Sequence, residues 1–320
     1  MEDAATQPPA QDPDERVPLV IIGGYLGTGK TTLVNHLLRE AEGRRIAVLV
    51  NDFGEVSIDA DLIEGASDGV LALAGGCVCC SFGDDLVGTL QRAAQRRPRP
   101  DIVLLECSGV CLPAAVARSA ALVQDVRVEG VVVVVDAAEL RRQSGDRYVG
   151  DTVRQQVHQA DLLILNHKAR CTLPEMLALR TWLAECVPGA PQADCAHGRV
   201  PSDLVLGVRA APKDEAAIWH GRGGPLRTSA QTSPHPMRHF QQRVDRPVDP
   251  HELARELVAA CGGLLLRAKG VVLGLDGPHW RVQVMGRRID IDPHVGDPCA
   301  NAGTVVGIKM LTERPTTERI

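Results

Sequence analysis

A short glycine-rich segment holds the residue types with the clearest chemistry. Its spacing, G-x-x-x-x-G-K-[ST], is met by Gly24, Gly29, Lys30 and Thr31. In such a P-loop the glycines let backbone N–H groups surround phosphate oxygens, the lysine neutralises the β- and γ-phosphates, and the threonine hydroxyl holds Mg²⁺. The alternative is a glycine-rich turn with a surface lysine. We predict nucleotide binding here by Gly24, Gly27, Thr28, Gly29, Lys30, Thr31 and Thr32.

Carboxylates stand at the ends of two later apolar runs. Asp52 and Glu55 follow the run 45–50, and Glu106 ends the run 102–106. Open α/β sheets bind ligands at the carboxyl ends of their strands, and in a P-loop fold such an acid faces Mg²⁺ and the γ-phosphate. We expect Asp52 and Glu106 to position metal-bound or attacking water beside a catalytic Lys30. For Asp52 and Glu55 the alternative is solvated loop charges.

Three cysteines, Cys77, Cys79 and Cys80, lie within four residues and follow two glycines. Thiols at this spacing pair poorly with one another, because a disulfide needs Cα atoms at a suitable separation and orientation. Thiolates favour Zn²⁺, which takes tetrahedral nitrogen and sulfur ligands. A buried small hydrophobe is the alternative for any single cysteine. The cluster predicts a transition-metal site.

The elements that must position these groups alternate along residues 17–210, a segment that we predict to be a P-loop domain. Buried strands are expected at 19–22, 45–50, 102–106, 130–136 and 161–166, and helices at 32–39 and 153–159. This alternation predicts an α/β fold with a doubly wound parallel sheet. Asn166, at the end of its strand, is expected to meet the nucleotide base.

A second, smaller α+β domain is expected at 236–320, after a linker rich in Gly and Pro at 211–235. Its predicted elements are a strand at 239–244, a helix at 250–261 capped by Asp249, and strands at 264–273 and 280–285. Residues 1–16 are acidic and lack an apolar stretch, so we expect a disordered lead-in rather than a signal peptide.

Composition limits the partners. A net charge of −5 without a long basic run gives no electrostatic footprint for direct, sequence-specific nucleic-acid binding. No run approaches the length of an apolar membrane span. Ten cysteines without an export signal indicate reduced thiols and a cytoplasmic location.

Six segments together resemble the CobW family, the metallochaperone-type P-loop GTPases of the SIMIBI class. They occur in the family's order and are 24–31, 51–59, 76–80, 106–109, 134–137 and 267–270. The resemblance spans about residues 17–310, and Cys-x-Cys-Cys behind a P-loop is its most specific part.

The resemblance implies that GTP and Mg²⁺ occupy the first domain while Cys77, Cys79 and Cys80 bind zinc or cobalt. Nucleotide hydrolysis would govern release of that metal to a client metalloprotein. Glu106 matches the family's Walker B acid, and Asp52 stands where the family has Glu.

The segment that reads the base departs from the family pattern. Asn-Lys-x-Asp is replaced by Asn166-His167-Lys168-Ala169, in which lysine is displaced by one place and the acid is missing. Asn166 and Lys168 are still predicted to bind the nucleotide. Without that acid, the N–H donors of guanine lack their acceptor, and the site loses a means of distinguishing guanine from adenine. The choice between GTP and ATP therefore stays open. Cys111, in a second departure, is predicted to be a packed core residue rather than a metal ligand.

Two functions are carried forward. The first is an Mg²⁺-dependent GTPase that couples hydrolysis to metal delivery. The second is a nucleotide-gated, zinc-responsive recruiter of a protein partner, such as a ribosome-associated factor, with little or no turnover. Maturation of a nickel enzyme is disfavoured because the cysteine cluster is not the usual motif for that role.

Overall fold

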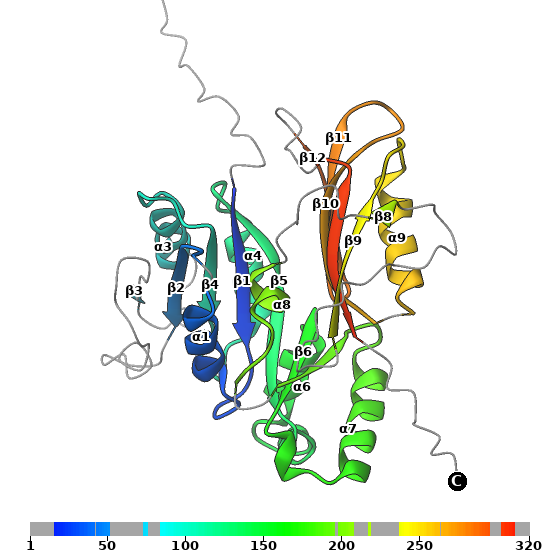
Figure 1. Cartoon of the computed structure of the whole chain (residues 1–320). Helices are drawn as coiled ribbons and strands as arrows, with labels where there is room; N and C mark the ends of the chain where they lie inside the picture. Colours follow the sequence, from blue (N-terminus) through cyan, green and yellow to red (C-terminus); the bar gives the residue numbers. More distant parts are fainter. Residues whose placement is uncertain are drawn as a thin grey trace, which may run out of the picture.

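A computed structural model of the chain describes residues 16–41, 43–51, 73–75, 84–195, 198–207, 217–218, 237–262, 264–294 and 302–310. These residues build a large parallel sheet with helices on both faces and a smaller antiparallel sheet beside it (Figure 1). The predicted doubly wound parallel sheet, accompanied by a smaller α+β unit, is confirmed.

In the described part of the chain the parallel sheet has seven strands in the order β3-β2-β4-β1-β5-β6-β7. Along the chain they are β1 (Val17–Gly23), β2 (Ile46–Asn51), β3 (Leu73–Gly75), β4 (Ile102–Glu106), β5 (Val126–Asp136), β6 (Leu162–Asn166) and β7 (Gln192–Asp194). Because β1 lies between β4 and β5, the loop after β1 opens at the centre of the sheet's carboxyl edge.

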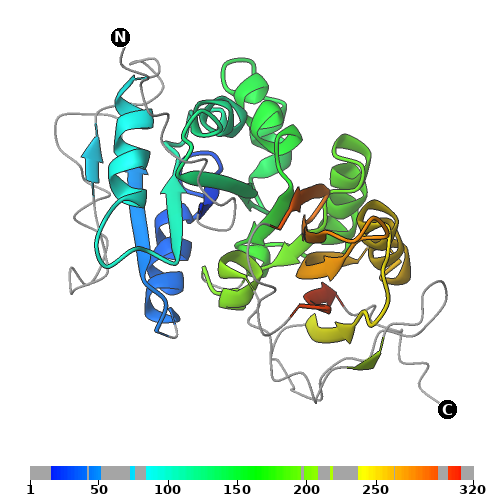
Figure 2. The same ribbon diagram turned by 90° about the horizontal axis from the view of Figure 1, so that it is seen from above.

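Both faces of this sheet are buried, which explains the unbroken apolar runs of its strands. Alternate residues such as Ile21 and Ile22 enter two separate cores. The helices on one face are α3 (Asp84–Ala94), α4 (Pro113–Ala120), α5 (Leu140–Ser144), α6 (Gly150–His158) and α7 (Leu173–Cys186). The other face packs against α1 (Lys30–Arg39), α8 (Ser202–Leu206) and the second sheet, as Figure 2 shows from above.

The second sheet has six strands among the described residues, in the order β12-β11-β10-β13-β9-β8. They are β8 (Ala217–Ile218), β9 (Met237–Arg243), β10 (Leu265–Leu273), β11 (His279–Met285), β12 (Arg288–Pro293) and β13 (Thr304–Met310). Helix α9 (Pro250–Ala260) covers one side, and the Asp249 side chain accepts hydrogen bonds from the backbone N–H groups of His251 and Glu252. The predicted cap is therefore confirmed.

The structure adds elements that the sequence patterns did not predict. Strands β12 and β13 extend the second sheet. Strand β8, which lies inside the range predicted as a linker, forms a short parallel pair with β9. The rest of that linker and residues 1–15 lie outside the described residues. Within the described residues, no helix is both long enough and apolar enough to span a membrane.

The turn from β1 into α1 depends on glycine. Gly24, Gly27 and Gly29 have φ angles of 136°, 73° and 96°, which L side chains rarely adopt. A Cβ on Gly24 would lie 2.2 Å from the Val134 carbonyl oxygen of β5, whereas a Cβ on Gly27 would meet nothing within 4 Å. The loop can thus lie directly on the neighbouring strand only when position 24 has no side chain.

A buried ion pair joins the two sheets. Arg267 of β10 and Glu129 of β5 are 1% and 5% exposed, and the Arg267 guanidinium donates to the Glu129 carboxylate and to backbone carbonyls of α8. Burial raises the pKa of Glu129, but the charges of Arg267, Arg127 and Lys269 outweigh it and hold that pKa below its usual value. The carboxylate therefore stays ionised inside the interface.

The glycine turn gives a first prediction. Gly24→Ala should lower the free energy of unfolding by about 3 kcal/mol, because it combines backbone strain with a collision against β5. Gly27→Ala, a control at a positive φ of 73° with free space around the new Cβ, should cost about 1 kcal/mol. Urea unfolding of both variants measures the difference. Equal losses would contradict this account of the turn.

The ion pair gives a second prediction. Arg267→Met should cost about 3 kcal/mol in the free energy of unfolding, because it leaves the Glu129 charge buried with weaker compensation. The double variant Arg267→Met with Glu129→Met removes both charges and should recover much of that loss. Urea unfolding followed by circular dichroism tests both. A double variant less stable than the single one would refute the interpretation.

Candidate functional site

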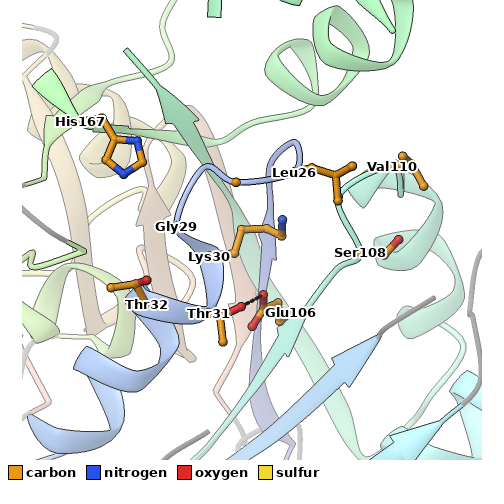
Figure 3. A pocket seen from close by; sticks show the side chains of 11 residues that line it. Leu26, Gly29, Lys30, Thr31, Thr32, Glu106, Ser108, Val110 and His167 are labelled. Carbon is orange, nitrogen blue, oxygen red and sulfur yellow. Dashed lines mark hydrogen bonds between the residues drawn. The ribbon is translucent and has the colours of Figure 1, made fainter. Parts of the chain in front are cut away.

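A cavity of about 630 Å³ opens at the carboxyl edge of the parallel sheet, a volume in the range of small-molecule sites. Three chain segments line it, from the loop after β1, the end of β4 and the end of β6 (Figure 3). The lining residues are Leu26, Gly27, Gly29, Lys30, Thr31, Thr32, Glu106, Ser108, Gly109, Val110 and His167.

One end of the cavity holds a cation, a hydroxyl and a carboxylate. The Thr31 hydroxyl donates to Glu106 Oε1 at 2.8 Å, and Lys30 Nζ donates to the Tyr25 carbonyl at 3.1 Å. The first turn of α1 also begins here, and the leading N–H groups of a helix have no carbonyl partner within it. Backbone donors, the Lys30 charge and the helix dipole all favour an anion at this end.

Asn166 packs against the loop between β1 and α1. It is 1% exposed, and its Nδ2 donates to the Thr28 carbonyl at 3.0 Å. A Cβ on Gly29 would lie 2.5 Å from this Nδ2, so the amide packs directly against the loop. Among the described residues none bonds to Asn166 Oδ1. Asn166 therefore fixes the position of the loop and is not itself among the residues that line the cavity.

His167 occupies the opposite end, apart from Thr31 and Glu106 (Figure 3). Its φ of 57° makes it the one described non-glycine residue with a positive φ. His167 Nδ1 lies 2.9 Å from Asp136 Oδ2, and because an ionised carboxylate only accepts, Nδ1 is the donor. Arg170 Nη1 also donates to Asp136 Oδ2 at 2.9 Å. These contacts hold the ring at the cavity wall.

Lys168 points to a different partner. Its Nζ lies 3.1 Å from Asp194 Oδ2, a carboxylate that Arg180 also contacts. Lys168 is not among the residues that line the cavity. Its predicted role in nucleotide binding stays a prediction, and the structure gives it an ion pair at the end of β7.

Two thiols lie behind the Glu106 segment. Cys107 and Cys111 are 0% and 4% exposed and belong to the core between the sheet and α3 to α7. A hydrogen bond to Cys111, together with burial, raises the pKa of Cys107 well above its usual value. The same hydrogen bond lowers the pKa of Cys111. Cys111 is thus the packed core cysteine that the sequence predicts, and Cys107 stays protonated.

The predicted metal ligands Cys77, Cys79 and Cys80, and the predicted catalytic Asp52, lie outside the described residues. Within the described residues, no group of three His, Cys, Asp or Glu side chains is arranged to hold a metal ion. The structure does place the strands that precede them, β2 before Asp52 and β3 before Cys77. Parallel pairing aligns Asn51 of β2 with Gly75 of β3, and Val50 with Glu106 of β4.

Sequence reasoning found most of the polar end of the cavity and missed part of its rim. Val110 and Leu26 contribute apolar side chains that are 41% and 59% exposed, and His167 contributes a ring. The only signal for Val110 was its place just after Glu106-Cys107-Ser108-Gly109. Nothing in the sequence marks the left-handed backbone of His167.

The chain is similar in sequence to two proteins named zinc chaperones. A protein named zinc chaperone CobW from Sinorhizobium sp is 29% identical over 63% of the chain and 65% of its own length. The chain thus spans less than two thirds of that relative. Zinc chaperone YjiA from Escherichia coli is 28% identical over 93% of the chain and 96% of its own length.

The crystal structure of Zn(II)-bound YjiA GTPase from E. coli aligns with 93% of this chain and 96% of that one, at 22% identity and a TM-score of 0.44. The model of the CobW/HypB/UreG nucleotide-binding domain matches residues 18–192. This match runs from β1 to the first residue of β7 and takes in more than half of the sequence. The chain therefore belongs to the CobW/HypB/UreG family.

Proposed function

We propose that the chain binds and hydrolyses GTP with Mg²⁺ and uses this cycle to hold zinc, or a similar ion such as Co²⁺, and release it to a client metalloprotein. The observation that carries the proposal is the hydrogen bond between Thr31 and Glu106, at the phosphate-binding end of a nucleotide-sized cavity. Family membership and the relatives named zinc chaperones support it.

Phosphate binding is assigned to the loop and the start of α1. Backbone N–H groups of residues 27–31 would surround the phosphate oxygens, and Lys30 would neutralise the β- and γ-phosphates. Lys30 is 8% exposed, so its charge acts in a partly dehydrated site where electrostatic attraction is strong. Gly24, Thr28 and Asn166 would contribute by holding this loop in place. Thr32 lines the same end and would add a hydroxyl.

Thr31 and Glu106 fit Mg²⁺ chemically, because they bring two adjacent oxygen donors to the phosphate end and this ion prefers oxygen ligands. When bound, the ion would neutralise charge that develops on the phosphate oxygens. Glu106 is 2% exposed, which keeps its carboxylate close to the phosphate end and away from bulk water. Together with Asp52, it would orient the attacking water for in-line displacement at the γ-phosphate.

Metal binding is assigned to Cys77, Cys79 and Cys80, whose soft thiolates suit zinc. The chain reaches Cys77 two residues after Gly75, the last residue of β3. The pairing of Gly75 with Asn51, and of Val50 with Glu106, relates this point to the phosphate end through two neighbouring strands. We propose that the cycle runs in the cytoplasm and that the partner is a client metalloprotein or a ribosome-associated factor.

Hydrolysis can be tested at Thr31 and Glu106. Thr31→Val and Glu106→Gln should each lower kcat for GTP by about 100-fold, because each removes a group that stabilises the transition state. Glu106→Gln should leave GTP affinity within a few-fold of the wild type. Thr181→Val, on the exposed side of α7, is the matched control and should leave both values unchanged. Phosphate release gives kcat, and full activity of Glu106→Gln would refute the assignment.

Metal coupling can be tested at Cys79. The wild-type chain should bind zinc and turn over GTP faster with zinc, whereas Cys79→Ala should lose both properties. Cys171→Ala, at a half-buried cysteine two residues before α7, is the control and should keep them. Zinc stoichiometry and phosphate release are the measurements. Absent turnover together with nucleotide-dependent capture of a protein partner would instead favour the recruiter.

A further inference from the structure

None of the described residues at the end of the cavity away from the phosphate site is acidic. Among the described residues that line it, Glu106 is the one carboxylate, and it bonds to Thr31 at the phosphate end. Guanine presents an N–H and an amino group along one edge, and sites that select it with high ratios bond to that edge. Two described acids stand at neighbouring strand ends, Asp136 on β5 and Asp194 on β7.

The neighbouring acids are committed to cations. Asp136, at the end of β5, accepts from His167 and Arg170 through Oδ2 and from the Ala138 backbone N–H through Oδ1. Asp194, at the end of β7, pairs with Lys168 and Arg180. The side chains of Asp136 and Asp194 are 8% and 18% exposed. Both charges are therefore used inside the protein.

His167 is the group that the chain presents at this end instead. Its left-handed backbone costs about 1 kcal/mol or more, and such strain persists where the surrounding structure enforces it. Here the enforcement comes from the Nδ1 contact with Asp136, which Arg170 shares. The result is an imidazole ring that lines the cavity wall and is held there through Nδ1.

We infer that the site holds a purine by stacking on the His167 ring and does not read the guanine edge, so that ATP competes with GTP on near-equal terms. The inference rests on the proposed function, because it concerns the base of the nucleotide whose phosphates Lys30 and Thr31 bind. Stacking on an aromatic ring tolerates any base, since every base has a π-face. Selection then lies mainly in the triphosphate, and the base adds affinity through its aromatic face.

A displacement experiment tests the selectivity. Fluorescent mant-GTP is bound to the full chain with Mg²⁺ and displaced by GTP, ATP or inorganic tripolyphosphate. We expect GTP and ATP to differ by less than about tenfold in Kd, where a site that reads the base edge gives ratios of 10⁴ or more. A ratio above about 100 in favour of GTP would overturn the inference.

Ring stacking is tested with His167→Asn. Asparagine tolerates the left-handed backbone and keeps an amide donor toward Asp136, but it has no aromatic ring. GTP and ATP should both bind about 5- to 100-fold more weakly, while tripolyphosphate affinity should not change. His158→Asn, on the exposed end of α6, is the matched control and should change none of the three affinities. An unchanged purine affinity in His167→Asn would refute stacking.

The two proposals fail in different ways. If mant-GTP and tripolyphosphate do not bind the wild-type chain, the proposed function fails with the site itself. If GTP and tripolyphosphate displace the label and ATP does not, the phosphate site stands and the inference about the base is wrong. The tripolyphosphate arm therefore separates the phosphate contacts from the contact with His167.

Discussion

The candidate site depends on one long-range contact, the hydrogen bond from Thr31 to Glu106 across 75 positions of the chain. Parallel pairing of β1 with β4 produces it, because Ile22 is aligned with Glu106 just before the loop begins. The Gly24 turn then returns the chain over β5, and α1 starts with Lys30 and Thr31 facing the end of β4. A shift of this pairing by one residue would turn the carboxylate to the other face of the sheet.

The second sheet stabilises this arrangement from a distance. Met285 and Ile308 share a core with Leu33 and Leu37 of α1, and Arg267 bonds to Glu129 and to the carbonyls of α8. None of the described residues lining the cavity belongs to the second sheet. Its contribution to the site is therefore the support of the sheet and of α1, which carry the site residues.

Much of the fold and one end of the site could be predicted from the sequence. The β-branched runs identify the central strands, and glycines with Lys30 and Thr31 identify a phosphate-binding turn because few other backbones need those residues. The two contacts that Asp136 makes with His167 and Arg170 could not be predicted, since they depend on strands and loops that meet only after folding. Strand β12 escaped prediction because its alternating charges are typical of an exposed edge.

The central claim is that the phosphate end of the cavity and the proposed zinc ligands Cys77, Cys79 and Cys80 influence one another through neighbouring strands. The most direct test measures the Kd of zinc for the full chain by calorimetry, once with a non-hydrolysable GTP analogue bound and once with GDP bound. Coupling of the usual size, about 1–3 kcal/mol, predicts zinc affinities that differ by at least about fivefold between the two states. Equal zinc affinities in both states would contradict the account.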